Sequence, residues 1–156
     1  MAHDNLFEPV KMGAQTLKNR IIMAPLTRLR AVEPGDVPTA LAGEYYSQRA
    51  GAGLVITEAT QVSFQAKGYA GAPGIHTEDQ TVAWKVIVDN VHGKGGKSVA
   101  QLWHTGLVAH DSVQPQGKAP ISAADVDVGA RTSLRDSDNQ AIRVEATPPR
   151  PASLDE

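Results

Sequence analysis

The sequence has no cysteine, which excludes a disulfide framework and any metal site built on thiolates. No apolar run approaches the roughly 20 residues needed to span a membrane. The amino-terminal residues lack a basic segment followed by an apolar core, so we expect no secretory signal. From these absences we expect a cytoplasmic protein with no membrane partner.

An excess of positive charge is equally absent. Lysine and arginine number 15 against 17 aspartates and glutamates, and the net charge of −2 is spread along the chain. A nucleic-acid-binding surface would need a basic stripe to neutralise phosphates, so we expect no nucleic-acid partner. Aromatic residues make up only 4%, whereas 14 glycines and 10 prolines predict many short connections in a globular chain.

Strand and helix patterns alternate through the first two-thirds of the chain. Continuous apolar stretches at 21–26, 53–59 and 97–103 are typical of strands buried on both faces of a parallel sheet. The segments between them, 39–50 and 77–93, show helical spacing and are long enough to make their flanking strands parallel. This order predicts an α/β fold. The expected buried faces are Leu41, Ala42, Tyr45 and Tyr46 in the first helix and Val82, Ala83, Val86, Ile87 and Val91 in the second.

Two β-hairpins are expected outside this sheet. Residues 6–12 are predicted to form an edge strand, because they contain a proline, and residues 13–15 would turn the chain back. In the polar carboxy-terminal third, 126–128 and 141–144 alternate between polar and apolar residues and would pair as a surface hairpin. Turn-forming residues occupy 136–139.

Capping boxes occur at two places, each with a hydroxyl residue followed three positions later by Gln or Glu. Thr77 and Gln80 start the second predicted helix. Ser153 and Glu156 predict another helix, although only its first turn is present and a chance match is the alternative. Three strands and two helices would also leave apolar sheet edges exposed. We therefore expect this chain to be part of a larger sheet.

Three motifs, in order and at matching spacing, resemble the first three barrel strands of the Old Yellow Enzymes. The resemblance covers nearly the whole chain and is close to the bacterial branch of N-ethylmaleimide and pentaerythritol tetranitrate reductases. It implies that residues 1–156 are the N-terminal part of a single FMN-binding (β/α)8 TIM-barrel domain. The chain would supply about the first three strands, an N-terminal hairpin and a surface β-hairpin. The motifs are NRIIMAPLTR at 19–28, GLVITEAT at 53–60 and QLWHTG at 101–106.

The resemblance also implies a function. FMN would be the cofactor, NAD(P)H its reductant, and the reaction a ping-pong hydride transfer to activated alkenes such as enones and maleimides, or to nitro compounds. Because a barrel of this kind needs eight strands, activity would require a complementary C-terminal fragment, either a separate chain or a continuation. The alternative is an inactive truncated barrel that serves at most as an interaction or assembly module. The residues do not decide between NADPH and NADH.

Candidate flavin-binding residues lie at the ends of the predicted strands, where barrel sites form. By resemblance the Thr27 hydroxyl hydrogen-bonds the flavin and tunes its potential; a bond to local backbone is the alternative. Gln101 is polar in an apolar strand, and its donors and acceptor suit the pyrimidine edge of a flavin, to which the resemblance assigns it. A buried Gln bonded to neighbouring backbone is the alternative. Contacts through backbone or apolar surface, or simple strand packing, are expected for Ala24, Pro25, Leu26 and Ala59.

Tyr69 and Trp103 resemble residues that line the substrate cavity of the family, although an aromatic residue at a strand end is more often core. His104 follows Trp103, and we interpret it as structural. In the family, the substrate-binding His pair, the proton-donating Tyr and the arginines for the FMN phosphate come from later segments. This chain would therefore carry only flavin-tuning and cavity-lining residues. No metal is expected, because metal-ligand spacing is absent from His76, His92 and His110.

Overall fold

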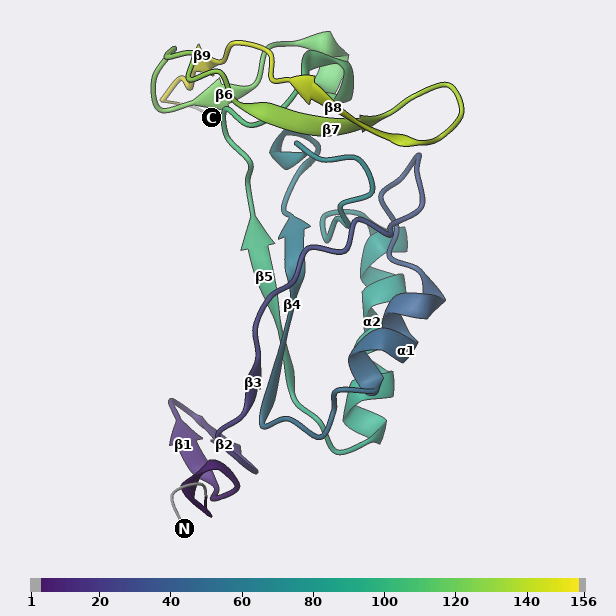
Figure 1. The fold of residues 1–156 in the computed structure, drawn as a ribbon, viewed down its shortest axis with the longest axis vertical. Helices are drawn as coiled ribbons and strands as arrows, with labels where there is room; N and C mark the ends of the chain where they lie inside the picture. Colours follow the sequence, from purple (N-terminus) through teal and green to yellow (C-terminus); the bar gives the residue numbers. More distant parts are fainter. Residues whose placement is uncertain (1–3, 155–156) are drawn as a thin grey trace.

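A three-stranded parallel sheet with two helices on one face forms the body of the chain (Figure 1). The computed structural model describes residues 4–154. Along the chain, the elements of this body are β3 (Ile22–Met23), α1 (Ala40–Ser47), β4 (Leu54–Gln61), α2 (Glu78–Gly93) and β5 (Ser98–Trp103). β4 lies in the centre and runs parallel to both neighbours. The predicted strand–helix order and the α/β class are confirmed.

Only the central strand is buried along nearly its whole length. β4 has a strand on each side and helices over one face. The expected burial of the outer strands is wrong: β3 has only two residues, Ile22 is 44% exposed, and Leu102 of β5 is 65% exposed. A strand at a sheet edge has a neighbour on one side only, so its pairing and burial are incomplete. Two apolar edges therefore lie open in residues 4–154.

α2 begins at the predicted capping box. Gln80 N donates to the Thr77 hydroxyl at 3.3 Å, and Thr77 N donates to the Gln80 side chain at 3.0 Å. These reciprocal bonds satisfy two amide groups that a helix start would otherwise leave without partners. The buried Gln80 side chain also donates to Gly35 O at 2.8 Å, so the cap ties α2 to an earlier loop.

Thr77→Ala is expected to lower the free energy of unfolding by about 1 kcal/mol, because it removes the side-chain half of the cap. Val82→Ala on the exposed side of the same helix is the matched control, with an expected change below about 0.5 kcal/mol. Denaturant unfolding followed by far-UV circular dichroism compares the two variants. Equal losses would contradict a stabilising role for the cap.

The buried face of α2 agrees with the predicted one only in part. The predicted Ile87 and Val91 enter the core and Ala83 is half-buried, but Trp84 takes the place of the expected Val82 and Val86, which are exposed. Residues spaced by three and four positions share one side of a helix, and the two valines lie on the other side. The apolar pattern alone is compatible with burial of either face of α2. In the structure, the face that carries Trp84 packs against the core residue Val55 of β4.

α1 packs closely against α2 through small residues. Tyr46 is its fully buried anchor, and the predicted Ala42 is partly buried beside the core. The prediction that Leu41 is buried is wrong, since it is 61% exposed. Gly43 faces α2 instead, and a Cβ there would meet the Asn90 amide at 2.7 Å. Close approach of the two helices therefore decides which side of α1 is buried.

The N-terminal hairpin is confirmed, with a shorter first strand than expected. β1 (Val10–Met12) pairs antiparallel with β2 (Gln15–Leu17). A short 3-10 helix, η1 (Asp4–Leu6), occupies the start of the segment predicted as strand 6–12. This hairpin lies at the end of the sheet where β4 begins (Figure 1).

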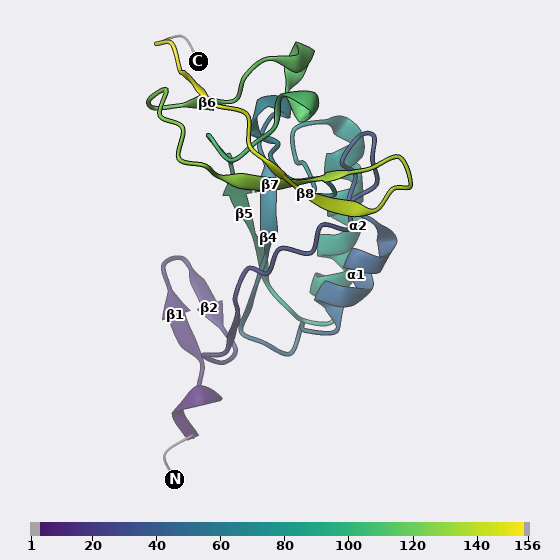
Figure 2. The same ribbon diagram turned by 45° about the horizontal axis from the view of Figure 1, so that its top comes forward.

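The surface hairpin uses a different first strand from the predicted one. β7 (Arg131–Arg135) pairs with β8 (Ala141–Glu145), so the expected pairing of 126–128 is wrong. Asp136 explains the choice, because its Oδ1 accepts hydrogen bonds from the amides two and four residues on, at 3.0 and 2.8 Å. A tight turn at the predicted 136–139 pairs the strand directly before it with the strand directly after it. The hairpin lies across the ends of β4 and β5 (Figure 2).

The remaining described elements are short: η2 (Phe64–Ala66), η3 (Asp111–Val113), η4 (Pro115–Gly117), β6 (Ile121–Ser122) and β9 (Arg150–Pro151), the last two forming a parallel pair. None of the helices within residues 4–154 has the length and apolar character required to cross a membrane. The second predicted capping box includes Asp155 and Glu156, which lie outside the described residues.

Candidate functional site

The predicted site residues gather at the carboxyl ends of the parallel strands. The register places Ala59 of β4 beside Gln101 of β5, and Gln61 beside Trp103. The segment 24–30, which contains Thr27, leaves β3 at the same end of the sheet. The β7–β8 hairpin lies across this end (Figures 1 and 2). Open α/β sheets bind ligands at this end, so we take it as the candidate site.

A β-bulge in β4 sets which side chains reach this site. Val55 packs with the helices, and Glu58 contacts Tyr46 of α1, so both face the helix layer. In a regular strand, residues three apart face opposite sides of the sheet. The β-bulge adds one residue to β4 between Ile56 and Ala59, which allows Val55 and Glu58 to face the same side. The Thr57 hydroxyl holds the bulge by donating to Glu58 O at 3.0 Å. After the bulge, Ala59 pairs with Gln101 of β5.

Thr27 lies in an irregular, exposed segment after β3. Ala24 and Leu26 are also exposed there, and Pro25 is half-buried. Among residues 4–154 no partner hydrogen-bonds the Thr27 hydroxyl, so the alternative of a bond to local backbone does not occur in this structure. The hydroxyl is therefore available to a ligand.

Gln101 is exposed on β5, so the alternative of a buried Gln bonded to neighbouring backbone does not occur in residues 4–154. Its backbone N donates to the Thr57 hydroxyl at 3.4 Å, but its side chain has no partner in the part of the chain that the structure describes. Ala59 beside it is buried and offers only a methyl group. A free amide, a free hydroxyl and a small residue between them fit the donors, acceptors and flat ring of a flavin.

Tyr69 and Trp103, predicted separately to line a cavity, stack on each other. Their ring centroids are 5.4 Å apart and their planes are inclined by 24°. The surface hairpin holds the tyrosine loop in place, because Ala70 N donates to Ser133 O at 2.9 Å. The two rings therefore form one aromatic wall, to which the end of β5 and a loop 34 positions earlier each contribute.

A buried ionic cluster, which the sequence did not reveal, supports the same loop. Lys67 Nζ lies 2.6 Å from both Glu33 Oε1 and Asp36 Oδ1. Gln61 Nε2 donates to Asp36 Oδ2 at 2.8 Å, and Arg135 Nε lies 3.6 Å from Glu33 Oε2. We call these five residues the Lys67 cluster. It joins an early loop, the end of β4, the tyrosine loop and β7.

Glu58 is the other candidate that sequence analysis missed. It is only 4% exposed, and its Oε2 accepts hydrogen bonds from Arg28 N at 2.8 Å and Leu29 N at 3.1 Å. Burial raises the pKa of the Glu58 carboxyl, and these backbone bonds oppose the rise. Burial likewise raises the pKa of the Tyr46 phenol, which hydrogen-bonds Glu58 and so stays protonated. A charged residue inside an apolar strand was the available signal, because carboxylates are rarely buried without partners.

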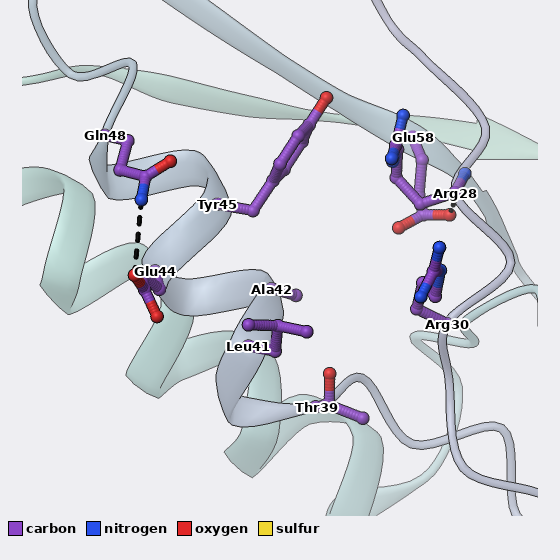
Figure 3. A pocket seen from close by; sticks show the side chains of 9 residues that line it. All are labelled: Arg28, Arg30, Thr39, Leu41, Ala42, Glu44, Tyr45, Gln48 and Glu58. Carbon is purple, nitrogen blue, oxygen red and sulfur yellow. Dashed lines mark hydrogen bonds between the residues drawn. The ribbon is translucent and has the colours of Figure 1, made fainter.

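Glu58 also lines a pocket of about 260 Å³ between α1 and the segment after β3 (Figure 3). Tyr45 forms one wall, with the Arg28 guanidinium 4.9 Å from its ring centroid. Neither Ala59 nor Gln101 lines this pocket, so it is distinct from the candidate flavin site. The candidate flavin site is open in residues 4–154, because β3 and β5 each have only β4 as a neighbour there.

Among the described residues, His104 makes only a local contact. His104 Nδ1 accepts a hydrogen bond from Gly106 N at 3.0 Å, which is a local turn contact that fits the structural interpretation. Within residues 4–154, no three His, Cys, Asp or Glu side chains are grouped to hold a metal ion.

Plant reductases are among the curated relatives of this chain. Putative 12-oxophytodienoate reductase 4 of Oryza sativa subsp. japonica is 51% identical over 121 residues, which cover 77% of this chain and 31% of the relative. 12-oxophytodienoate reductase 2 of Arabidopsis thaliana is 42% identical over 152 residues, covering 97% and 39%. The chain thus spans about a third to two-fifths of the length of these relatives.

Solved structures share the fold. Morphinone reductase in complex with tetrahydroNAD superposes with a TM-score of 0.91 at 44% identity, covering 97% of this chain and 41% of that one. The old yellow enzyme homologue from Zymomonas mobilis gives a TM-score of 0.87 at 40% identity, covering 97% and 40%. The described fold therefore corresponds to part of these larger chains.

A family model for NADH:flavin oxidoreductases and NADH oxidases matches residues 5–145. With the relatives above, it confirms the resemblance seen in the three strand motifs. The family description also supports FMN as the cofactor. The chain belongs to the NADH:flavin oxidoreductase / NADH oxidase family, together with the Old Yellow Enzymes.

Proposed function

We propose that this chain is the flavin-binding N-terminal part of an FMN-dependent ene-reductase. β3, β4 and β5 are then the first three strands of a (β/α)8 barrel, and residues 1–156 belong to a single domain. A complementary C-terminal part, in a separate chain or a continuation, completes the barrel. The open apolar edges of β3 and β5 and the share of the relatives' length that the chain spans both support this proposal.

When bound, FMN would supply hydride chemistry between NAD(P)H and an activated alkene such as an enone or maleimide, or a nitro compound. The Thr27 hydroxyl would hydrogen-bond the ring and adjust its potential, and the Gln101 amide would hold the pyrimidine edge. Ala59 leaves room for the ring to approach β4. The stacked Tyr69 and Trp103 exclude water and limit the substrate cavity. Donation of the proton falls to a residue outside this chain.

One observation carries this proposal. The side chains of Thr27 and Gln101 have no hydrogen-bond partner among residues 4–154; Gln101 lies beside Ala59 near the carboxyl end of β4, and Thr27 lies in the segment that leaves β3 at the same end of the sheet. The morphinone reductase complex with tetrahydroNAD supports a nicotinamide nucleotide as the reductant. The alternative function is an inactive assembly module, which would use the same open edges but would hold no flavin.

A visible absorption spectrum of the purified protein, recorded beside its intact mass, tests the proposal. We expect a flavin band near one equivalent, together with a second polypeptide or a longer chain in the mass spectrum. A single mass for 156 residues and no flavin would contradict the activity and favour the assembly module.

Thr27→Ala is expected to slow flavin reduction by NAD(P)H roughly two- to tenfold, because one hydrogen bond to the ring is lost. Stopped-flow absorbance of the flavin band measures this half-reaction. Thr16→Ala, in the hairpin at the other end of the sheet, is the matched control and should leave the rate unchanged. An unchanged rate in Thr27→Ala would remove this residue from the flavin site.

A further inference from the structure

The Glu58 carboxyl is buried in β4 and has a specific set of partners. Oε2 accepts from Arg28 N at 2.8 Å and Leu29 N at 3.1 Å, while Oε1 accepts from the Tyr46 hydroxyl at 3.4 Å. Glu58 N in turn donates to the Tyr46 oxygen at 2.8 Å. A carboxyl group is costly to bury unless such bonds satisfy it, so its place in this strand needs an explanation. Figure 3 shows the Glu58 carboxyl directed at the segment that carries Arg28.

The two amides that Glu58 binds belong to the irregular segment that follows β3, and we call residues 28–29 of this segment the Leu29 turn because the backbone there passes through a left-handed residue. Leu29 has φ +55°, in the left-handed region that is disfavoured for a side chain of its size. Successive amides around a left-handed residue point the same way and form a nest for an anionic oxygen. The turn is also packed tightly, since a Cβ on Gly71 would lie 2.5 Å from Leu29 O. Glu58 thus holds a backbone conformation that the residues themselves do not favour.

The two amides bonded to Glu58 directly follow Thr27, the candidate flavin residue. In the described chain, the stretch from Pro25 to Arg30 has no backbone hydrogen bonds apart from the two that Glu58 accepts. β3 ends at Met23, and the next backbone bond beyond the stretch is from Ala31 N to Gly71 O at 2.9 Å. The position of the Thr27 hydroxyl therefore depends on the Glu58 contact more than on any other hydrogen bond nearby.

We infer that Glu58 is a positioning residue that sets the place of the Thr27 hydroxyl against the flavin, acting through the amides of Arg28 and Leu29. The inference rests on the proposed function, because it concerns the same flavin site. Glu58 itself faces the helix layer and does not touch the ring. A carboxyl that served stability alone would affect unfolding but would not be coupled to Thr27.

Glu58→Gln in the FMN-loaded protein tests the inference, because the amide keeps the shape but loses the charge and one acceptor. We expect exchange of the Arg28 and Leu29 amide protons, followed by NMR, to accelerate by at least about tenfold. Glu44→Gln is the matched control: this exposed carboxyl lines the same pocket but bonds only to Gln48, at 3.2 Å. It should leave exchange at the turn unchanged.

A double-mutant cycle with Thr27→Ala separates positioning from stability. The midpoint potential of the flavin should shift in Thr27→Ala and in Glu58→Gln, and the double variant should show no further shift. Additive shifts, or a Glu58→Gln protein with wild-type exchange and potential, would overturn the inference. If Glu58→Gln does not fold, Glu58→Asp gives the same readouts, because it keeps the charge and shortens the reach to the two amides.

Failure of the proposed function gives a different result. A wild-type protein that takes up no FMN would overturn that function and the flavin part of this inference together. The exchange measurement needs no flavin, so it decides independently whether Glu58 anchors the turn.

Discussion

Lys67→Met is expected to lower the free energy of unfolding by about 3–5 kcal/mol, because it removes the cation that pairs with the buried Asp36 carboxylate and the largely buried Glu33 carboxylate, leaving Glu33 only the longer contact with Arg135. Lys67 Nζ lies 2.6 Å from both Glu33 and Asp36, and the lysine side chain is only 14% exposed. Methionine is similar in length, so the loss reports the charge and hydrogen bonds rather than volume. Denaturant unfolding at neutral pH measures it.

Lys85→Met is the matched control for this prediction. Lys85 also lies 2.6 Å from a carboxylate, Asp89, but the two side chains are 74% and 60% exposed. Solvent screens such a pair, so we expect a loss below about 1 kcal/mol. If the two lysine variants lost the same stability, burial would not be what makes the Lys67 cluster stabilising.

The Lys67 contribution should also depend on pH. Burial alone lowers the pKa of Lys67, but hydrogen bonds with Asp36 and Glu33 outweigh it and raise the pKa above the ordinary lysine value. The stabilisation is therefore complete below the pKa of an unfolded lysine and is lost as the pH rises through the folded-state pKa. We expect the difference between wild type and Lys67→Met to shrink in alkaline solution, and a difference that grew there would contradict the sign of the shift.

Trp84→Ala is expected to cost about 3–5 kcal/mol of unfolding free energy, because it empties the space between the two helices and β4. The ring is 4% exposed, lies 6.1 Å from the Tyr46 ring and belongs to the main core cluster. Its Nε1 donates to Gly74 O at 2.9 Å, which joins α2 to the loop after β4. Thermal and denaturant unfolding measure the loss.

Two further variants separate the contributions of packing and of the hydrogen bond to the stability loss in Trp84→Ala. Trp84→Phe keeps most of the apolar volume but leaves Gly74 O without its donor, so we expect about 1–3 kcal/mol. Val86→Ala, on the exposed side of α2, should change stability by less than about 0.5 kcal/mol. A Trp84→Ala loss no larger than that of Val86→Ala would place the indole outside the core.

Local signals in the sequence were read correctly where all partners lie within a few residues. The cap between Thr77 and Gln80 and the turn at 136–139 are examples, since their hydrogen bonds span at most four positions. The order of strands and helices follows from the same short-range patterns. Pairing 126–128 with β8 failed because alternation does not say which strand adjoins the turn.

The candidate site was predictable as a list of residues and not as an arrangement. The family resemblance pointed to Thr27, Gln101, Tyr69 and Trp103, and the parallel register places Gln101 and Trp103 beside the end of β4. Tyr69 and Trp103 stack because a loop and the end of β5, far apart in the chain, meet. Gln101 is exposed because β5 lies at an edge of the sheet. No local pattern encodes such contacts, because they form only when distant segments pack.

The sequence by itself determined the α/β class, the helix starts, the turns and, through its motifs, the family. Only the tertiary structure decided which faces are buried, how Lys67 is paired and why Glu58 lies inside β4. The physical reason is that burying a charge depends on donors and acceptors brought from elsewhere, here 30 positions away for Glu58 and Arg28. Short-range propensity specifies elements, and long-range packing specifies the site.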